Sequence, residues 1–360
     1  MSADQLCRYV RASKCTGVTN YCGLVKFEDR GRLYVINDCS VVRRDIGDKT
    51  NGNIGEIKDV TSHSIKVKTG DGDLEIFGIT DLDGKTVDMP AFFNTGYTFG
   101  KGAEEEFSKL QYHIAEKWAQ QARLIEPEIV NELKAMRPFE IPVHWKKGIG
   151  LSSNTYEETF QFSESLAFPV WSPSFANRFE SGAWLAGTLA DFIHRLTGQD
   201  QLTIAVSSKP FFPTEKAWLE LVCPFLPVHW HGKADQPIQD GWWQHREAIL
   251  KSAQRGIFLR DLFSRSPELN GSESKGLLSL LMNCYVGSLA DIESLSCQPF
   301  IGIEQSASGN FRFFVNAGKT SKILAVALTK AFHVFYKSIS ENPGLEIPFV
   351  NIGTPGVVKR

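Results

Sequence analysis

The sequence has no long apolar run and no excess of charge of either sign. No stretch of the 360 residues approaches the roughly 18 consecutive apolar residues of a membrane-spanning helix, and the opening MSADQLCRYVRASK has no apolar signal-peptide core. With 39 Lys and Arg against 41 Asp and Glu, the formal net charge is −2. We therefore expect no membrane association and no broad positive field of the kind that draws proteins onto nucleic acid.

The cysteines do not have the pattern of a disulfide framework. Seven of them, an odd number, are spread over a long chain, which predicts free thiols in a reducing, cytoplasmic compartment. Four lie within the first 39 residues, but seven, six and sixteen residues separate them, where paired zinc ligands are usually roughly two to four apart. This spacing favours buried or free thiols over a zinc site, and we expect no cofactor. The seven are Cys7, Cys15, Cys22, Cys39, Cys223, Cys284 and Cys297.

Common catalytic motifs are also missing. The chain contains no G-x-x-x-x-G-K-[ST] phosphate loop, no G-x-S-x-G nucleophile elbow, no H-E-x-x-H metal motif and no dinucleotide G-x-G-x-x-G between a strand and a helix. The sequence therefore leaves open whether the protein is an enzyme.

What is present is the composition of a folded protein with more than one domain. The residues are 42% hydrophobic and 22% charged, within the globular range, and 360 residues exceed what one core usually organises. We predict an α+β protein with four parts. These are a β-rich SH3-like domain (1–100), a helical connector (101–137), a mixed strand, loop and helix region (138–200), and a ferredoxin-like domain (201–360).

The first part reads as short strands separated by turns. Ile65 and Val67 alternate with Lys66 and Lys68, as in a half-buried strand, and Asp71-Gly72 is typical of a tight turn. We expect a small β barrel or sandwich. After it, apolar residues recur at helical spacing from Phe107, and Pro127 interrupts or restarts that helix.

Residues 33–108 resemble the small SH3-like barrel of superfamily 1 helicases of the RecD and conjugative-relaxase kind. The family's N-G-D-I-G turn is matched by Asn51, Gly52, Ile54 and Gly55, with Asn53 in place of Asp. The resemblance implies a barrel of a type that handles nucleic acid or protein partners. The helicase ATPase motifs are absent, so it implies no helicase activity.

The last part has the element order β-α-β-β-α-β over residues 202–352, which is that of a ferredoxin-like fold with an enlarged helical crossover. The RNA-recognition module shares this order and stacks bases on strand aromatics. Phe311 and Phe313 match its F-x-F core and fall on one face of a strand, so they predict a stacking platform. The alternative is that both rings belong to the core beneath the helix at 320–339.

Cations near these strands complete the predicted nucleic-acid site. Arg312 lies between the two aromatics, Lys319 and Lys322 follow them, and Lys66 and Lys68 belong to the β-rich domain. Ala317-Gly318-Lys319-Thr320 also starts a helix, where Thr320 serves as an N-cap or the segment holds an anion.

A second candidate site is an H-x-H pair on a predicted strand. His229 and His231 would point to the same side, and His245, Asp235 or Asp240 would complete a three-ligand metal site with an open position for water. The alternative is an aromatic-rich loop whose histidines are hydrogen-bonded polar tips.

From these observations we predict a nucleic-acid-associated binding subunit, for RNA or single-stranded DNA, in an intracellular complex with protein partners. The alternatives are a metal-dependent hydrolase that uses His229 and His231, and a structural assembly component without a ligand of its own.

Overall fold

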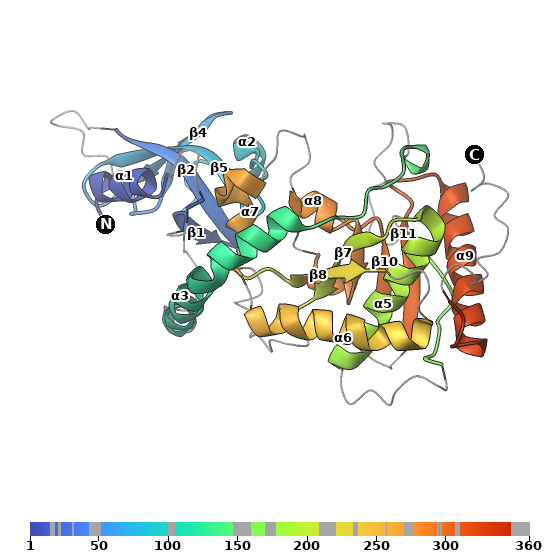
Figure 1. Cartoon of the computed structure of the whole chain (residues 1–360). Helices are drawn as coiled ribbons and strands as arrows, with labels where there is room; N and C mark the ends of the chain where they lie inside the picture. Colours follow the sequence, from blue (N-terminus) through green and yellow to red (C-terminus); the bar gives the residue numbers. More distant parts are fainter. Residues whose placement is uncertain are drawn as a thin grey trace. The chain divides into compact units, whose positions relative to one another are not determined.

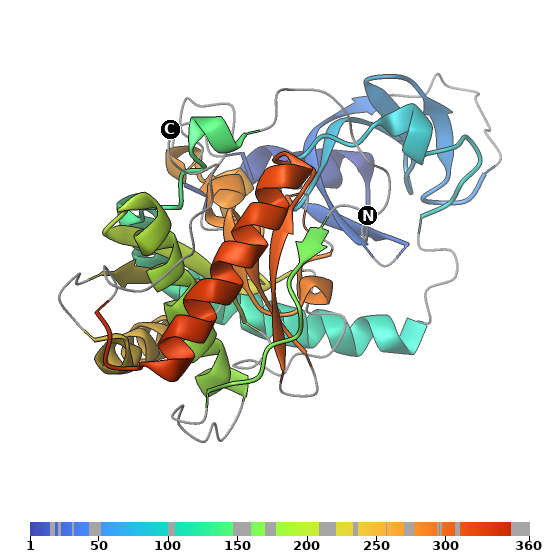
Figure 2. The same cartoon turned by 90° about the vertical axis from the view of Figure 1, so that its right-hand side faces the viewer.

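The computed structural model (Figures 1 and 2) divides into two compact units. The first comprises residues 1–134, 214–223 and 258–276, and the second comprises residues 135–213, 224–257 and 277–360. The residues that the structure describes are 1–14, 19–20, 23–30, 32–42, 52–99, 105–146, 160–169, 178–208, 221–232, 237–256, 258–269, 277–293, 295, 297–306 and 310–346.

The first unit contains an antiparallel five-stranded sheet with the order β1-β2-β5-β4-β3. Over the described residues β1 and β3 stay at opposite edges, so the sheet is open and the predicted barrel does not form. Its alternation is as predicted in β4, where Ile65 and Val67 are buried and the two lysines are half-buried. The strands are β1 (Lys26–Asp29), β2 (Arg32–Val42), β3 (Ile57–Val60), β4 (Ser64–Lys68) and β5 (Asp73–Asp81).

Helix α1 (Ala3–Ala12) packs on this sheet against β2 and β5, and the sequence analysis did not predict it. Ser2 begins it with a capping box, in which its hydroxyl accepts from the backbone N–H of Gln5 and the Gln5 side chain accepts from the backbone N–H of Ser2. Ala3, Cys7 and Val10 recur at helical spacing and form its buried face.

Two further parts of the first unit come from distant positions in the chain. Helix α3 (Glu105–Ala135) continues through Pro127 without a break. Beside it lies α7 (Leu262–Arg265), which follows far along the sequence (Figure 1). The Arg265 guanidinium is fully buried and bonds to the carboxylates of Glu126 in α3 and Asp261, the latter at 3.0 Å. A short helix, α2 (Met89–Phe92), follows β5.

The second unit is built on a six-stranded mixed sheet with the order β6-β11-β10-β9-β7-β8. Strand β9 runs parallel to both of its neighbours, and the other pairs are antiparallel. The strands are β6 (Phe160–Phe162), β7 (Gln201–Ser207), β8 (Phe225–His231), β9 (Cys284–Val286), β10 (Ile301–Gln305) and β11 (Phe311–Asn316).

Three long helices pack on the sheet of the second unit: α5 (Arg178–Thr197), α6 (Ile238–Arg255) and α9 (Lys322–Glu341). Figure 2 shows α9 lying across the strands. The apolar residues of all three join those of the sheet in one core. The apolar residues of the stretch 275–287 predict a helix, but the described part of this stretch contains only the short helix α8 (Leu277–Leu281), since β9 begins at Cys284. Helix α6 is capped at its C-terminus by Gly256, whose φ of 98° favours glycine. Short 3-10 turns stand at Val143–Trp145, Pro267–Leu269 and Leu289–Asp291.

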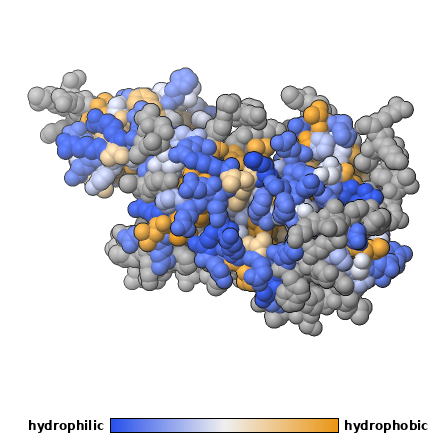
Figure 3. All heavy atoms as spheres, in the orientation of Figure 1, coloured by the Kyte–Doolittle hydropathy of each residue, from blue (hydrophilic) through white to orange (hydrophobic). Residues whose placement is uncertain are grey.

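The α+β class is therefore confirmed. The hairpin of β10 and β11 followed by α9 has the predicted order, but the sheet holds more strands than a ferredoxin-like sheet, and the predicted final strand lies largely outside the described residues. On the face drawn in Figure 3, hydrophobic residues are scattered among hydrophilic ones. Within the described ranges, no helix is long and apolar enough to cross a membrane.

Candidate functional site

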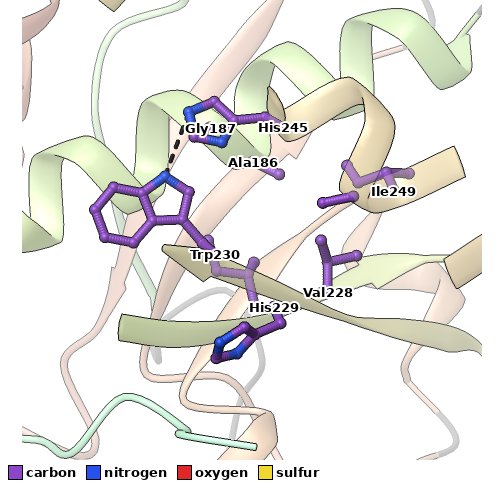
Figure 4. Close-up of a pocket in the computed structure, with 9 residues that line it drawn as sticks. Ala186, Gly187, Val228, His229, Trp230, His245 and Ile249 are labelled. Carbon is purple, nitrogen blue, oxygen red and sulfur yellow. Dashed lines mark hydrogen bonds between the residues drawn. The ribbon is translucent and has the colours of Figure 1, made fainter. Parts of the chain in front are cut away.

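Strand β8 carries the two histidines of the H-x-H pair at the edge of the second sheet. Because side chains alternate along a strand, His229 and His231 share one face and Trp230 points to the other. The burial follows this alternation, since both histidines are exposed and Trp230 is only 4% exposed. Figure 4 shows the His229 ring directed away from Trp230. We call the side with the histidines the outer face of β8 and the side with Trp230 its inner face.

On the outer face, a cation stands near His229. Its register partner on β7 is Thr203, whose backbone N–H donates to the Arg137 carbonyl at 2.7 Å, while the Arg137 N–H donates to the Thr203 hydroxyl at 3.2 Å. Pro138 is therefore in parallel register with Thr203, and Arg137 is the residue before it, with an exposed side chain. Partial burial, followed by the nearby His231 and Arg137, lowers the pKa of His229 below its usual value, so the neutral imidazole is favoured.

On the inner face, Trp230 belongs to a buried polar cluster. Its indole N–H donates to His245 Nε2 of α6 at 3.3 Å, and the two rings stack with centroids 6.1 Å apart. Asp191 of α5 places Oδ1 3.8 Å from the same nitrogen. The indole also contacts His194, one turn further along α5, with centroids 5.6 Å apart.

Burial moves the pKa values of this cluster in opposite directions. It raises the pKa of the Asp191 carboxyl to about 8 and lowers the pKa of the His245 imidazole to about 4, because an apolar environment disfavours the charged form of each group. Near neutral pH both groups are therefore uncharged, and the carboxyl carries a proton. This matches the hydrogen bond from Trp230, since a neutral His245 ring can accept at Nε2.

A small recess adjoins the cluster between α5, α6 and the strands (Figure 4). It has room for no more than about one water molecule, so it is not a substrate pocket as it stands. A glycine makes the space for the His245 ring, because a Cβ at Gly187 would lie 2.2 Å from its Cδ2 atom. The recess is lined by Ala186, Gly187, Ile204, Val228, His229, Trp230, His245, Ala248 and Ile249.

The structure separates the three histidines proposed as metal ligands. His229 and His231 lie on the outer face of β8, whereas His245 contacts Trp230 on the inner face. Asp235 lies outside the described residues. Across the ranges that the structure describes, no group of three His, Cys, Asp or Glu side chains is placed to hold a metal ion.

The predicted nucleic-acid platform is wrong, because Phe311 and Phe313 are fully buried. Phe313 stacks on Phe332 of α9 with centroids 4.2 Å apart, and Phe311 meets Tyr336 edge-on at 5.1 Å. Burial of both rings beneath α9 was the alternative that the sequence left open. No base can reach them.

The cations assigned to nucleic acid do not surround an aromatic surface. Arg312 is exposed, bonds to Glu304 at 2.5 Å and covers the Phe162 ring at 4.3 Å. Lys319 donates to the Gln298 carbonyl, and Lys322 is exposed in the first turn of α9. In the other unit, Lys66 lies opposite Glu75 in the strand register, and Lys68 donates to the Gly52 carbonyl.

One family model matches the chain, that of the formyl transferase C-terminal domain, over residues 1–96. The match covers most of the segment compared with helicase barrels, so the helicase resemblance is wrong, and so is the predicted function as a nucleic-acid-associated binding subunit. A role with protein partners stays a prediction. No curated protein matches the chain.

Solved structures that resemble the chain include condensation domains of synthetases and a nonribosomal peptide synthetase. The starter condensation domain of rhizomide synthetase, in a product-released mutant, is 9% identical with a TM-score of 0.48, covering 80% of this chain and 71% of that one. The first condensation domain of the calcium-dependent antibiotic synthetase is 14% identical with a TM-score of 0.45, covering 81% and 70%. A four-domain synthetase bound to AMP and glycine is 15% identical with a TM-score of 0.40, covering 64% of this chain, which spans only 20% of that one. Values in this range do not establish a shared activity.

Sequence reasoning found the two histidines of β8 but missed the cluster beneath them. Asp191 was overlooked although it is the one acid in the apolar run AWLAGTLADFI of α5, which is the signal that could have found it. Its partners Trp230 and His245 lie far away in the sequence, so only the fold brings the three together.

Proposed function

We propose that this protein catalyses the transfer of an acyl group, with His229 as the general base. The observation that carries the proposal is the pair of exposed imidazoles on the outer face of β8, with Arg137 close enough to act on the charge of His229. The family match over residues 1–96 supports the reaction class and suggests formyl, the smallest acyl group, as one candidate.

Each group has a defined task in such a transfer. The neutral His229 imidazole takes the proton of an attacking amine, hydroxyl or thiol as that nucleophile bonds to the carbonyl carbon. The Arg137 guanidinium stabilises the negative charge that develops on the carbonyl oxygen. When the tetrahedral intermediate collapses, the imidazolium returns the proton to the leaving group. His231 stands two residues away on the same face and helps to hold the acceptor.

The test is an acyl-transfer assay with hydroxylamine as acceptor and formyl and acetyl thioesters as donors, with the hydroxamate product measured. We expect His229→Gln to lower the rate by about 100-fold or more, in the range of general-base catalysis. His333→Gln is the matched control, because that histidine is exposed on α9 of the same unit. Equal rates for wild type and His229→Gln, or no hydroxamate from either donor, would contradict the proposal.

The pH dependence gives a second measurement on the same assay. A base must be unprotonated to act, and its surroundings hold the pKa of His229 below its usual 6.5. The rate should therefore rise with pH and reach half of its maximum below pH 6.5.

We also infer that the protein works in a reducing, cytoplasmic compartment. The support is that the buried Cys7, Cys39 and Cys284, in the described parts of the chain, are free thiols.

A further inference from the structure

Two of the free thiols meet in the first unit. Cys7 lies on the buried face of α1, and Cys39 lies in β2, on which that helix packs. Their Sγ atoms are 3.3 Å apart, and the Cys7 thiol is also 3.0 Å from the Cys39 carbonyl oxygen. The two side chains are 2% and 7% exposed.

The contact is close to what a disulfide requires. An S–S bond is about 2.05 Å long, so the sulfur atoms need to approach by only about 1.2 Å. The spacing of cysteines along the sequence gives no hint of this pair, because 31 residues lie between them.

We propose that Cys7 and Cys39 are a reversible oxidation site that closes to a disulfide on reaction with a low-molecular-weight disulfide such as oxidised glutathione. One cysteine, as its thiolate, attacks the glutathione disulfide, forms a mixed disulfide and releases one glutathione thiolate. The second cysteine then attacks the mixed disulfide, forms the Cys7–Cys39 bond and releases the other. The protein loses two electrons and two protons, and oxidised glutathione becomes two molecules of the reduced thiol.

The position of α1 controls this reaction. Burial, together with the Cys7 thiol and the charge of Asp38, raises the pKa of the Cys39 thiol to about 12 against the weaker opposing effect of Arg11, so the attacking thiolate is scarce while the helix is in place. Helix α1 is held by the Lys14–Asp38 ion pair at 2.8 Å and by the bond from the Ala3 N–H to Asp71 at 2.9 Å. Local opening of the helix exposes both thiols, and their oxidation afterwards ties it to β2.

The experiment incubates the full chain with oxidised glutathione and maps its peptides under non-reducing conditions. We expect one Cys7–Cys39 linked peptide, 2 Da lighter than the two reduced peptides together, which dithiothreitol abolishes. The melting temperature of the oxidised protein should rise by several degrees, because the cross-link removes freedom from the unfolded chain. If Cys7 and Cys39 stay reduced, or carry glutathione without forming the link, the proposal is overturned.

Variants separate this site from other thiol chemistry. Cys7→Ala and Cys39→Ala should each lose both the linked peptide and the rise in melting temperature, whereas Cys297→Ala, which changes a partly exposed cysteine of the second unit, should keep both. The wild-type peptide map decides the outcome even if either buried variant fails to fold. The acyl-transfer assay is independent of this result.

Discussion

Asp191 is a buried carboxyl whose pKa is raised to about 8 by burial, and this shift should appear in the stability of the protein. The unfolded chain loses this proton near pH 3.8, whereas the native protein keeps it up to about pH 8. Between these values the native state binds one more proton, so Asp191 makes stability fall as the pH rises. His245 acts oppositely between about pH 4 and 6.5, because there only the unfolded state is protonated.

Between about pH 4 and 6.5 the contributions of Asp191 and His245 to the pH dependence of the free energy of unfolding cancel. Above pH 6.5 only the decrease caused by Asp191 remains. From pH 6.5 to 8 only Asp191 contributes, and we expect the free energy of unfolding to decrease by about 2 kcal/mol. The variant Asp191→Asn should abolish this decrease. Its free energy of unfolding should instead increase between pH 4 and 6.5, because only the contribution of His245 is left. Urea unfolding across this range measures both, with the exposed Asp59→Asn as control. A wild-type decrease that survives in Asp191→Asn would show that another group causes it.

The sequence indicated the position of a site residue where its partners are near in the sequence, and failed to do so where they are distant. The H-x-H pair was visible because strand geometry alone puts both imidazoles on one face. Its assignment to one site with His245 failed because that contact runs through the opposite side of β8, and a sequence does not tell which side of a strand a later helix covers.

At the scale of elements, the sequence analysis predicted α9, the hairpin of β10 and β11, and a helix within the region 138–200 where α5 lies. Prediction failed where elements are short. Helix α1 has only ten residues, and it was missed although Ala3, Cys7 and Val10 recur at helical spacing. Strand β9 follows α8 so closely that the whole apolar stretch read as one helix.

The packing of α5 against α6 gives a prediction with a matched control on one helix. Gly187→Ala should destabilise the protein by roughly 1–3 kcal/mol, because the new Cβ would lie 2.2 Å from Cδ2 of a buried ring. Gly182→Ala should be neutral or stabilising by about 0.5–1 kcal/mol, since nothing lies within 4 Å of its Cβ position and alanine favours the helix. Thermal unfolding compares the two, and equal effects would contradict close packing of His245 on Gly187.

At the scale of the whole molecule, each of the two units is built from three separate segments of the chain. The sequence analysis placed its boundaries one after another, yet the first unit takes in residues 214–223 and 258–276 after the chain has already entered the second. Composition and linker patterns can indicate domains that follow one another along the chain. A later segment that folds back into an earlier domain can be recognised only from its contacts in the structure. Arg265 makes such a contact, and nothing in its local sequence indicates a partner 139 residues earlier.

A fragment of residues 1–134 tests whether the returning segment is needed. This fragment contains every strand of the first sheet and the buried Glu126 but lacks Arg265 and Asp261. In the full chain the Glu126 side chain is 0% exposed and bonds to the Arg265 guanidinium. Removing one partner of a buried ion pair typically costs about 3–5 kcal/mol, which is a large part of the stability of a small domain. We therefore expect the fragment to be largely unfolded at room temperature.

The variant Glu126→Leu distinguishes the lost ion pair from a general loss of packing. In the fragment it removes the uncompensated carboxylate and should recover part of the stability, whereas in the full chain the same change leaves Arg265 with one fewer partner and should destabilise the protein. Circular dichroism during heating measures both. A fragment that melts as cooperatively as the full chain, or that Glu126→Leu does not improve, would show that the first unit holds together without the returning segment.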